Sequence, residues 1–328
     1  MIKIVYTGPF KVPLQNHVQL KKAMGRKYDI NAAHLKRFDR FTLEKYPDAM
    51  LLTKKIVLDW CKKTTYESQA NQCARATFLR QFAKYLDSIG VDAYIIPKRY
   101  FPTEPHYVPY IYTVDELRRF FAQTDRYRFH CLCPWRHLIM PVIFRMIYMC
   151  GLRVSEARLL KVANVDLVHG VLSILHSKED NDRLVPMSEC LTERCRLFAA
   201  QVHRHSAPDD YFFPGFFGKP MTLKYLYYLF RKVLWCAGIS HGGRGSGPRI
   251  HDFRHTYAVH CLKQLAEQKK DLTVYLPILK TYMGHQSFYE TAYYLRMTAD
   301  VFPEITLKME TCYPEIIPTL QGENNEND

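Results

Sequence analysis

The stretch His251-Asp252-Phe253-Arg254-His255-Thr256-Tyr257-Ala258 determines how the rest of this sequence is interpreted. Its Asp252 can cap a helix, which would place His251 at the helix entrance and Arg254 in the first turn. Unpaired N–H groups and the dipole at a helix N-terminus both favour anions, so a His and an Arg on one face could grip a phosphate. Taken alone, this pair is equally compatible with a structural role.

A second arginine occurs in the stretch Cys150-Gly151-Leu152-Arg153-Val154-Ser155-Glu156. It follows the apolar run Val142–Met149, which is typical of a buried helix, and the glycine indicates the turn after that helix. Ser155 and Glu156 are suited to open the next helix, with the carboxylate near its positive end. Arg153 would then be held at a helix junction. The alternative is a structural arginine whose partner is Glu156.

Two further elements lie downstream, a histidine turn and a tyrosine pair. The stretch Tyr282-Met283-Gly284-His285-Gln286-Ser287 carries the histidine, and Tyr293 and Tyr294 come after it. His285 and Tyr294 are nine positions apart, which allows a loop and a short helix between them, so both side chains could face one site. By themselves, such residues are more often part of a core or its rim.

The sequence also predicts one antiparallel hairpin. Two β-leaning runs, Val171–Leu175 and Arg183–Pro186, flank the turn-forming segment His176–Asp182, which contains Lys178. The remaining patterned segments have apolar residues at helical spacing. The predicted fold class is therefore mainly α with a small antiparallel β-sheet.

In this order and spacing, the elements resemble the phage-integrase (tyrosine recombinase) family. That family has an Arg in a G-L-R-x-S-E turn, a Lys in a β-hairpin, an H-x-x-R pair, an L-G-H turn, and a nucleophilic Tyr nine residues after that His. The resemblance covers about residues 113–294, and it departs from the pattern at Met283, where Leu is usual, and at Tyr293, beside the nucleophile position. The family's catalytic positions are filled here by Arg153, Lys178, His251, Arg254, His285 and Tyr294.

The resemblance implies attack on a DNA phosphodiester, whose transition state carries extra charge on its non-bridging oxygens. Arg153 and Arg254 would neutralise that charge from fixed positions. His251 and His285 would donate further hydrogen bonds, and one of them could help to remove the tyrosine proton. Such help is needed because a free tyrosine has a pKa of about 10.

Tyr294 would attack the phosphorus and form a 3′-phosphotyrosine, with Lys178 protonating the departing 5′ oxygen. The covalent link conserves the energy of the broken bond, so the implied reaction needs no metal, ATP or other cofactor. The sequence also lacks a G-x4-G-K-[ST] phosphate-binding loop and a carboxylate cluster suited to two Mg²⁺ ions.

Composition and charge are consistent with a nucleic-acid-binding enzyme. Lys and Arg total 46 against 32 acidic residues, a formal charge of +14, which favours a polyanionic partner without separating DNA from an anionic membrane surface. No uninterrupted apolar stretch reaches the roughly 18 to 20 residues of a membrane span, and Met1–Gln15 lacks a secretory pattern, so we expect a cytoplasmic protein.

The ten cysteines are scattered, which favours buried hydrophobic roles over disulfides. The densest group, His130-Cys131-Leu132-Cys133 with His137, has no second cysteine pair, so we predict no metal site.

Proline spacing divides the chain. Pro97, Pro102, Pro105 and Pro109 favour an extended connector, after which Thr113 and Glu116 have the spacing of a helix capping box. The predicted organisation is 1–105, an N-terminal helical core-binding domain and connector; 106–312, a mixed, mostly helical catalytic domain; and 313–328, a C-terminal tail.

The N-terminal domain is predicted to bind DNA through basic residues interleaved with a helical pattern from Gln15 to Leu86, which Gly90 ends. A solvated helix face is the alternative for each of them. The candidate DNA contacts are Lys54, Lys55, Arg75, Arg80 and Lys84.

The family resemblance further implies a homotetramer on two specific double-stranded DNA sites, passing through a Holliday junction. The apolar tail residues Phe302, Ile305 and Leu307 could dock on a neighbouring protomer or on their own domain. Two alternatives remain: a type IB topoisomerase, which relaxes supercoils with the same chemistry, and a non-catalytic DNA-binding relative. The target sequence, and the choice among phage integration, transposition and chromosome resolution, stay open.

Overall fold

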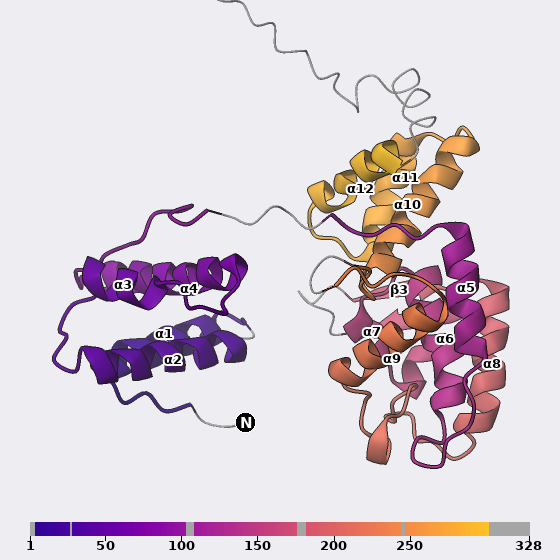
Figure 1. Ribbon diagram of the computed structural model, residues 1–328, viewed down its shortest axis with the longest axis horizontal. Coiled ribbons are helices and arrows are strands. Elements are labelled where there is room, and N and C mark those ends of the chain that lie inside the picture. The colour runs from indigo at the N-terminus through magenta and orange to yellow at the C-terminus, as the bar shows by residue number, and fades with distance from the viewer. Residues whose placement is uncertain (1–3, 27, 103–107, 176–181, 244–246, 302–328) are drawn as a thin grey trace, which may run out of the picture. The chain divides into compact units, whose positions relative to one another are not determined.

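The computed structural model describes residues 4–26, 28–102, 108–175, 182–243 and 247–301 of the 328-residue chain. The chain divides into two compact units, Met1–Tyr107 and Val108–Asp328. The first unit is built around one hydrophobic core and the second around two. Helices predominate in both (Figure 1).

The first unit consists of helices packed around apolar side chains such as Leu14, Phe38 and Phe82, which are fully buried. The predicted helical character between Gln15 and Leu86 is confirmed, with interruptions where the chain turns. The helices are α1 (Lys11–Ala23), α2 (Asp29–Lys45), α3 (Lys54–Cys61) and α4 (Gln69–Ser88).

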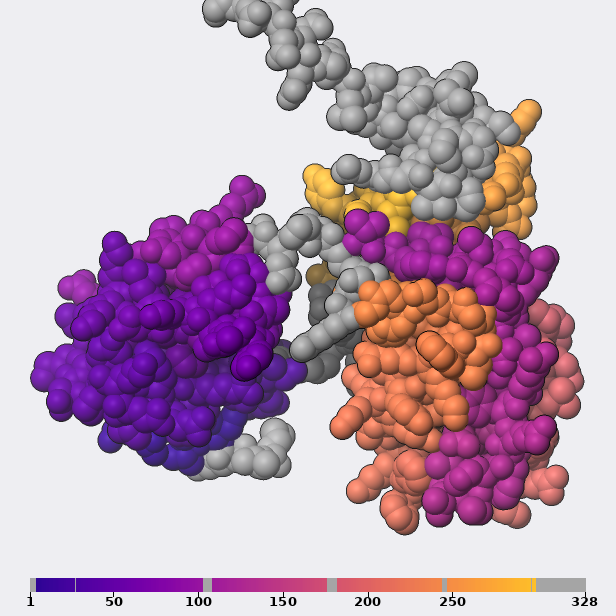
Figure 2. Space-filling model, viewed as in Figure 1, coloured from indigo at the N-terminus to yellow at the C-terminus, as the bar shows by residue number. Residues whose placement is uncertain are grey.

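The second unit is mostly helical with a small sheet. Figure 2 shows that α5 and the segment around α9 form one side of its surface. Its α-helices are α5 (Val114–Asp125), α6 (Arg136–Met149), α7 (Val154–Arg158), α8 (Glu189–Val202), α9 (Leu223–Cys236), α10 (Asp252–Glu267), α11 (Leu272–Met283) and α12 (Phe288–Val301). Two 3₁₀ turns, η1 (Val162–Asn164) and η2 (Phe216–Gly218), complete its helical elements in the described ranges.

The sheet has three antiparallel strands in the order β1-β2-β3: β1 (Val165–Asp166), β2 (Val171–Ile174) and β3 (Arg183–Pro186). Ile174 pairs with Arg183 at the end of the β2–β3 ladder, which confirms the predicted hairpin. The mainly α fold class with a small antiparallel sheet is therefore confirmed. Lys178, expected in the hairpin turn, lies outside the described residues.

The helix start predicted at Thr113 is confirmed, because Thr113 and Glu116 form a capping box at the beginning of α5. The residue just before it is anchored on α10. The Tyr112 N–H donates to Thr256 Oγ1 at 3.1 Å, and its ring stacks on Phe253 with centroids 4.7 Å apart. The start of the second unit is thereby fastened to the helix that begins at Asp252.

Two helices end in glycine turns that lie next to the candidate site. After α6, Gly151 has a φ of +58°, and the Leu152 N–H donates to the Ile147 carbonyl at 3.1 Å. This is the Schellman arrangement, in which a left-handed residue lets the chain leave the helix while satisfying its last carbonyls. Gly284, with a φ of +66°, ends α11 with the same hydrogen-bond pattern.

Helices α10, α11 and α12 lie together at one end of the second unit and enclose its second core (Figure 1). Ala258, Leu276 and Met283 are buried there, and so is Tyr294 on α12. The candidate nucleophile is thus part of a helix core, and only its polar end is available for chemistry.

Candidate active site

The His251–Ala258 stretch forms the entrance and first turns of α10, with one correction to its predicted capping. His251 occupies the N-cap position, and Asp252 is the first helical residue. The Asp252 carboxylate turns back to accept a hydrogen bond from the Arg249 N–H at 2.7 Å, so it braces the preceding loop and does not cap α10. Arg254 lies in the first turn, as predicted.

Arg254 is almost completely buried, with 1% of its surface exposed. Its guanidinium donates to the Gly151 carbonyl at 2.7 Å and to the Met283 carbonyl at 2.6 Å. Both acceptors belong to the C-terminal turns of α6 and α11, where backbone carbonyls carry partial negative charge and favour a cation. Burial first, and then the charge of Arg153, lowers the pKa of Arg254 to about 10, so the group stays cationic at neutral pH.

Arg153 is held at the α6–α7 junction by two different elements. It donates to the Glu156 carboxylate at 2.9 Å and to the Gly284 carbonyl at 3.0 Å. The pairing with Glu156, considered as the structural alternative, is therefore present. Arg153 also keeps 17% of its side chain exposed and lines the cavity described below, so the pairing positions it there.

Glu156 joins two arginines across the site. Arg183, on β3, grips the same carboxylate with two hydrogen bonds of 3.0 and 2.8 Å, and its Nε donates to the Tyr282 carbonyl. Burial alone would raise the pKa of Glu156, but the hydrogen bonds and charge of Arg183, together with Arg153, bring it below its ordinary value. In the sequence, Arg183 is recognisable only as the start of a strand.

Tyr294 extends its hydroxyl toward this group of cations. Only 3% of the residue is exposed, and its ring lies beside that of His285, with centroids 5.8 Å apart and an interplanar angle of 20°. Its pKa is raised to about 12, because burial outweighs the opposing charge and hydrogen bond of Arg254 and the charge of Arg153. At neutral pH it is therefore a neutral phenol.

His285 is oriented by Thr291, a residue that no sequence motif singles out. The ring Nδ1 is 2.9 Å from the hydroxyl of Thr291, which lies fully buried on α12. Burial, and then the charges of Arg254 and Arg153, lower the pKa of His285 to about 3. The imidazole is consequently neutral, and Thr291 fixes which way its other nitrogen faces.

His255 contacts the hydroxyl oxygen of Tyr294. Its Nδ1 is 3.0 Å from the Tyr294 hydroxyl, and its ring packs edge-on against that of His251, with centroids 4.8 Å apart. This residue lies within the leading motif, yet the sequence alone assigned it no role. The available signal was helical geometry: His251 and His255 are four residues apart and therefore share a face.

These side chains surround a cavity of about 330 Å³. Tyr293 also reaches it, but this residue is 41% exposed, whereas Tyr294 is buried against the histidines. A cavity with two guanidinium groups and three imidazoles can hold one tetrahedral anion next to a phenol. The lining residues are Arg153, His251, Arg254, His255, His285, Glu290, Tyr293 and Tyr294.

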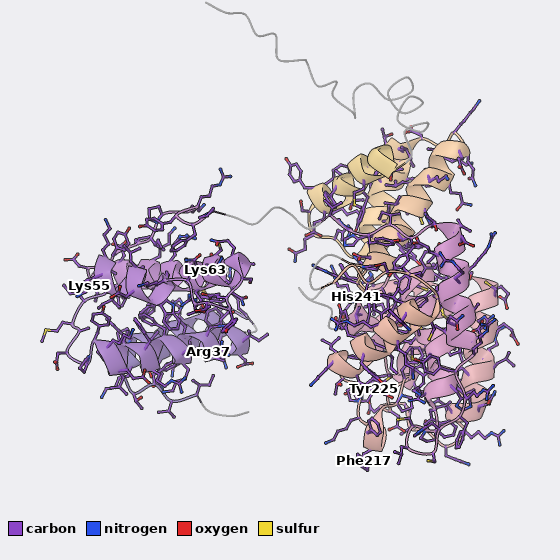
Figure 3. The ribbon with its side chains drawn as sticks, viewed as in Figure 1. Arg37, Lys55, Lys63, Phe217, Tyr225 and His241 are labelled. Atoms are coloured by element: carbon purple, nitrogen blue, oxygen red, sulfur yellow. The ribbon has the colours of Figure 1, made fainter. Side chains whose placement is uncertain are left out.

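The candidate DNA contacts of the first unit fall into two groups. Lys54, Lys55 and Lys84 are exposed, and Lys55 is labelled at the surface of its unit in Figure 3. Arg75 is bound by the carbonyls of Trp60 and Lys62 and by Glu67, and Arg80 donates to the carbonyls of Ile96 and Pro97. Both guanidinium groups are therefore hydrogen-bonded within the first unit.

Metal clusters and membrane-spanning helices are both absent from the described part of the chain. No group of three or more His, Cys, Asp or Glu side chains is arranged there to hold a metal ion. None of the helices in these ranges is both long and apolar enough to cross a membrane.

The mostly helical fold thus carries a cavity in which two arginines lie next to a buried tyrosine. The chain belongs to the phage integrase family, whose model matches residues 113–300. The family resemblance predicted from the sequence motifs is therefore confirmed.

Similar proteins are named as integrases or recombinases. A Sinorhizobium fredii protein named "Putative integrase/recombinase y4rB" is 28% identical over 309 residues, covering 92% of this chain and 97% of that protein. Tyrosine recombinase XerC of Staphylococcus saprophyticus is 24% identical over 70% of this chain and 71% of its own length. The family and these relatives support site-specific DNA recombination as the activity.

Solved structures show the same fold. XerH recombinase bound to a palindromic difH substrate superposes with a TM-score of 0.59 at 19% identity, covering 80% of this chain and 74% of that chain. The Tn1549 transposon integrase in complex with a circular intermediate DNA gives a TM-score of 0.61 at 16% identity, over 86% of this chain and 94% of that chain.

Proposed function

We propose that this protein is a site-specific DNA recombinase of the integrase/transposase type, which breaks and rejoins DNA through a 3′-phosphotyrosine at Tyr294 and a Holliday junction. The observation that carries the proposal is the cavity in which the Tyr294 phenol faces Arg153 and Arg254. A buried tyrosine among fixed cations suits attack on a phosphodiester, since the cations offset the charge that develops in the transition state.

The scissile phosphate would occupy this cavity. Arg254 is fixed by two backbone carbonyls, and Arg153 by Glu156 and the Gly284 carbonyl, so both cations are in place before DNA binds. Fixed donors stabilise developing charge without reorganising during the reaction, and loss of one such donor typically costs about 10²–10³ in rate. His251 and His285 would complete the donor set around the phosphate.

The cleavage step is a transesterification. The Tyr294 oxygen bonds to phosphorus, the bond from phosphorus to the 5′ oxygen breaks, and the DNA strand is left with a free 5′-hydroxyl. Lys178 would supply the proton for that hydroxyl as the general acid, a role carried over from the family resemblance. A 5′-hydroxyl from the partner duplex then attacks the phosphotyrosine, restores the phenol and joins the new strand.

We further propose that the reaction proceeds without metal or ATP. The phosphotyrosine ester conserves the energy of the broken phosphodiester, so rejoining requires no external energy source. Charge neutralisation, which divalent ions supply in two-metal nucleases, is assigned here to the two arginines. Cleavage in the presence of a chelator and without nucleotide would test both points.

Double-stranded DNA with specific recombination sites is the proposed partner. Residues 1–105 would form a core-binding domain that contacts the duplex through Lys54, Lys55 and Lys84, residues 106–312 the catalytic domain, and residues 313–328 a tail. The XerH and Tn1549 integrase structures, which contain DNA, support this assignment of partner. Four protomers would assemble on two duplexes.

Covalent capture tests the proposal even though the target sequence is unidentified. A pool of nicked duplexes with randomised sequence around the nick is incubated with the protein, and adducts that survive denaturation are recovered and sequenced. The nick traps the adduct because the short cleaved fragment diffuses away with its 5′-hydroxyl. Wild type and Tyr293→Phe should yield an enriched sequence and an adduct, whereas Tyr294→Phe should yield neither.

Two outcomes would overturn the proposal. DNA binding without any adduct would identify a non-catalytic DNA-binding relative. An adduct together with relaxation of supercoiled plasmid, and no strand exchange between two copies of the selected site, would identify a type IB topoisomerase activity.

A further inference from the structure

One histidine that the proposed mechanism leaves unused touches the reacting atom. His255 Nδ1 is 3.0 Å from the Tyr294 hydroxyl, and the two rings are 5.5 Å apart at an angle of 51°. His285 stacks on the same tyrosine, but its Nδ1 is occupied by Thr291. The histidine contact with the nucleophilic oxygen itself is therefore made by His255.

The surroundings of Tyr294 determine the direction of this hydrogen bond. The guanidinium of Arg254, which can only donate, lies beside the phenol and lowers the pKa of Tyr294, so it offers the hydroxyl no acceptor. The hydroxyl hydrogen of a buried phenol then needs an acceptor, and His255 Nδ1 lies at the right distance. His255 consequently carries its own ring hydrogen on Nε2 and presents the Nδ1 lone pair to Tyr294.

The electrostatics keep that lone pair available. Burial, followed by the charges of His251, Arg254 and His285, lowers the pKa of His255 to about 3. The ring is therefore neutral at physiological pH and cannot lose its acceptor by protonation. The charged or titratable groups around His255 come from four helices and their ends: His251 at the N-cap of α10 and Arg254 on α10, Arg153 before α7, His285 after α11, and Glu290, Tyr293 and Tyr294 on α12.

We propose that His255 is a catalytic residue, whose Nδ1 takes the proton of the Tyr294 hydroxyl as the phenol oxygen attacks phosphorus. This inference rests on the proposed function and replaces the expectation that His251 or His285 removes this proton. His251 and His285 remain phosphate donors.

The proton balance closes over one round of cleavage and rejoining. The phenol proton moves to Nδ1 while the oxygen–phosphorus bond forms, which makes the phenol oxygen steeply more acidic. The bound phosphate is an anion that offsets the cations around His255, so the imidazolium is better tolerated than in the DNA-free protein. When a 5′-hydroxyl displaces Tyr294, its proton passes to Lys178, which gave up one during cleavage, and the proton on Nδ1 returns to the departing phenolate.

Two substitutions separate proton transfer from positioning. His255→Asn keeps an amide oxygen near the Nδ1 position, so it can still accept the hydrogen bond but cannot take the proton. His255→Ala removes both functions. The matched control is His260→Asn, because His260 lies on the same helix and its Nδ1 is 2.9 Å from the hydroxyl of Tyr148, away from the cavity.

Single-turnover adduct formation on the captured DNA is measured against pH for each variant, with thermal unfolding as the check on folding. His255→Asn should form the adduct about 10²–10⁴-fold more slowly than wild type. Its rate should rise about tenfold per pH unit, because only the spontaneous phenolate reacts. Placing a more acidic fluorotyrosine at position 294 should accelerate His255→Asn more than wild type. His260→Asn should match wild type.

A sulfur leaving group distinguishes protonation of the departing 5′ atom from deprotonation of the Tyr294 hydroxyl. When the bridging 5′ oxygen is replaced by sulfur, the thiolate departs without a proton, since thiols are far more acidic than alcohols. This substrate should rescue Lys178→Ala and leave His255→Asn slow.

Three results would overturn the inference while leaving the proposed function intact. They are a His255→Asn rate within about threefold of wild type at every pH, rescue of His255→Asn by the sulfur substrate, and ¹⁵N NMR showing the Nδ1–H form of His255 in the DNA-free protein. Absence of an adduct from wild type would instead contradict the proposed function itself.

Discussion

The guanidinium of Arg254 is hydrogen-bonded at 2.7 Å to the backbone carbonyl of Gly151, a residue 103 positions earlier in the chain. A second bond, to the Met283 carbonyl, ties the same side chain to the end of another helix. This deeply buried cation is therefore held by the ends of α6 and α11, and its position depends on how these helices terminate.

Gly151→Ala should destabilise the second unit and displace Arg254. The residue has a φ of +58°, and an added Cβ would lie 2.6 Å from the Tyr257 ring. The left-handed conformation alone costs about 1–2 kcal/mol with a side chain present, and the clash adds to it. Gly218→Ala is the matched control, because its φ is +70° but its Cβ would meet nothing within 4 Å. Chemical denaturation should show a clearly larger loss in the free energy of unfolding for Gly151→Ala than for Gly218→Ala. Equal losses would mean that the Tyr257 ring moves aside without an energetic penalty.

Glu156→Gln should remove a stabilisation that depends on pH. In the folded protein the pKa of the Glu156 carboxyl lies below its ordinary value of 4.5. The carboxylate therefore stabilises the fold fully at pH values above 4.5, and this stabilisation is lost as the pH falls through the lower pKa of the folded state. At neutral pH the variant leaves Arg153 and Arg183 without their shared counter-charge, which should cost about 3–5 kcal/mol. Denaturant titrations from acidic to neutral pH should show a smaller acid-dependent loss in the variant. If the variant lost as much stability between neutral and acidic pH as wild type, other carboxylates would account for the acid-dependent loss.

Thr291→Val should slow adduct formation through His285. Valine keeps the shape of this buried side chain but deletes the hydroxyl 2.9 Å from His285 Nδ1, so the ring loses the partner that orients it. A donor misplaced by about 1 Å can cost up to about 10²-fold in rate, and the unpaired nitrogen about 1–3 kcal/mol in stability. Thr298→Val is the control on the same helix, since that hydroxyl donates to the Tyr294 backbone carbonyl. Similar rates for the two variants would remove Thr291 from the positioning scheme.

Lys55→Ala should change DNA binding, whereas Arg75→Ala should change the stability of the first unit. Exposed Lys55 should contribute to DNA binding, so its loss should weaken affinity and reduce the slope of log affinity against log salt by about 1. Arg75 is 18% exposed and bound to Glu67 and two carbonyls, so its loss should lower the stability of the first unit. Binding isotherms at several salt concentrations, with a parallel unfolding measurement, distinguish the two. A salt slope unchanged by Lys55→Ala would remove that residue from the interface.

Local signals in the sequence predicted the elements whose stability is local. The capping box at Thr113 and the β2–β3 hairpin each depend on one short, continuous segment of the chain, and both are present. The roles of Arg183 and Thr291 could not be predicted, because each depends on a partner brought close by folding. The predicted capping role of Asp252 was wrong, since a carboxylate at a helix entrance can equally bind the preceding loop.

The contact between His255 and Tyr294 likewise could not be predicted from the spacing of residues in the sequence. His255 comes one residue after Arg254, and adjacent helical residues point in different directions. Its proximity to Tyr294 arises from the packing of α10 on α12, which no spacing within either helix reveals. Motif spacing singled out five candidate residues that line the cavity, whereas the contact of His255 with the phenol required the fold.

Met283 illustrates how an arginine can be held by main-chain atoms alone. This position departs from the leucine usual in the family, yet the atom that binds Arg254 is the carbonyl oxygen, which every amino acid possesses. The methionine side chain is fully buried and serves only the helix core. Replacing Met283 by another apolar residue of similar volume should therefore leave the acceptor that holds Arg254 in place.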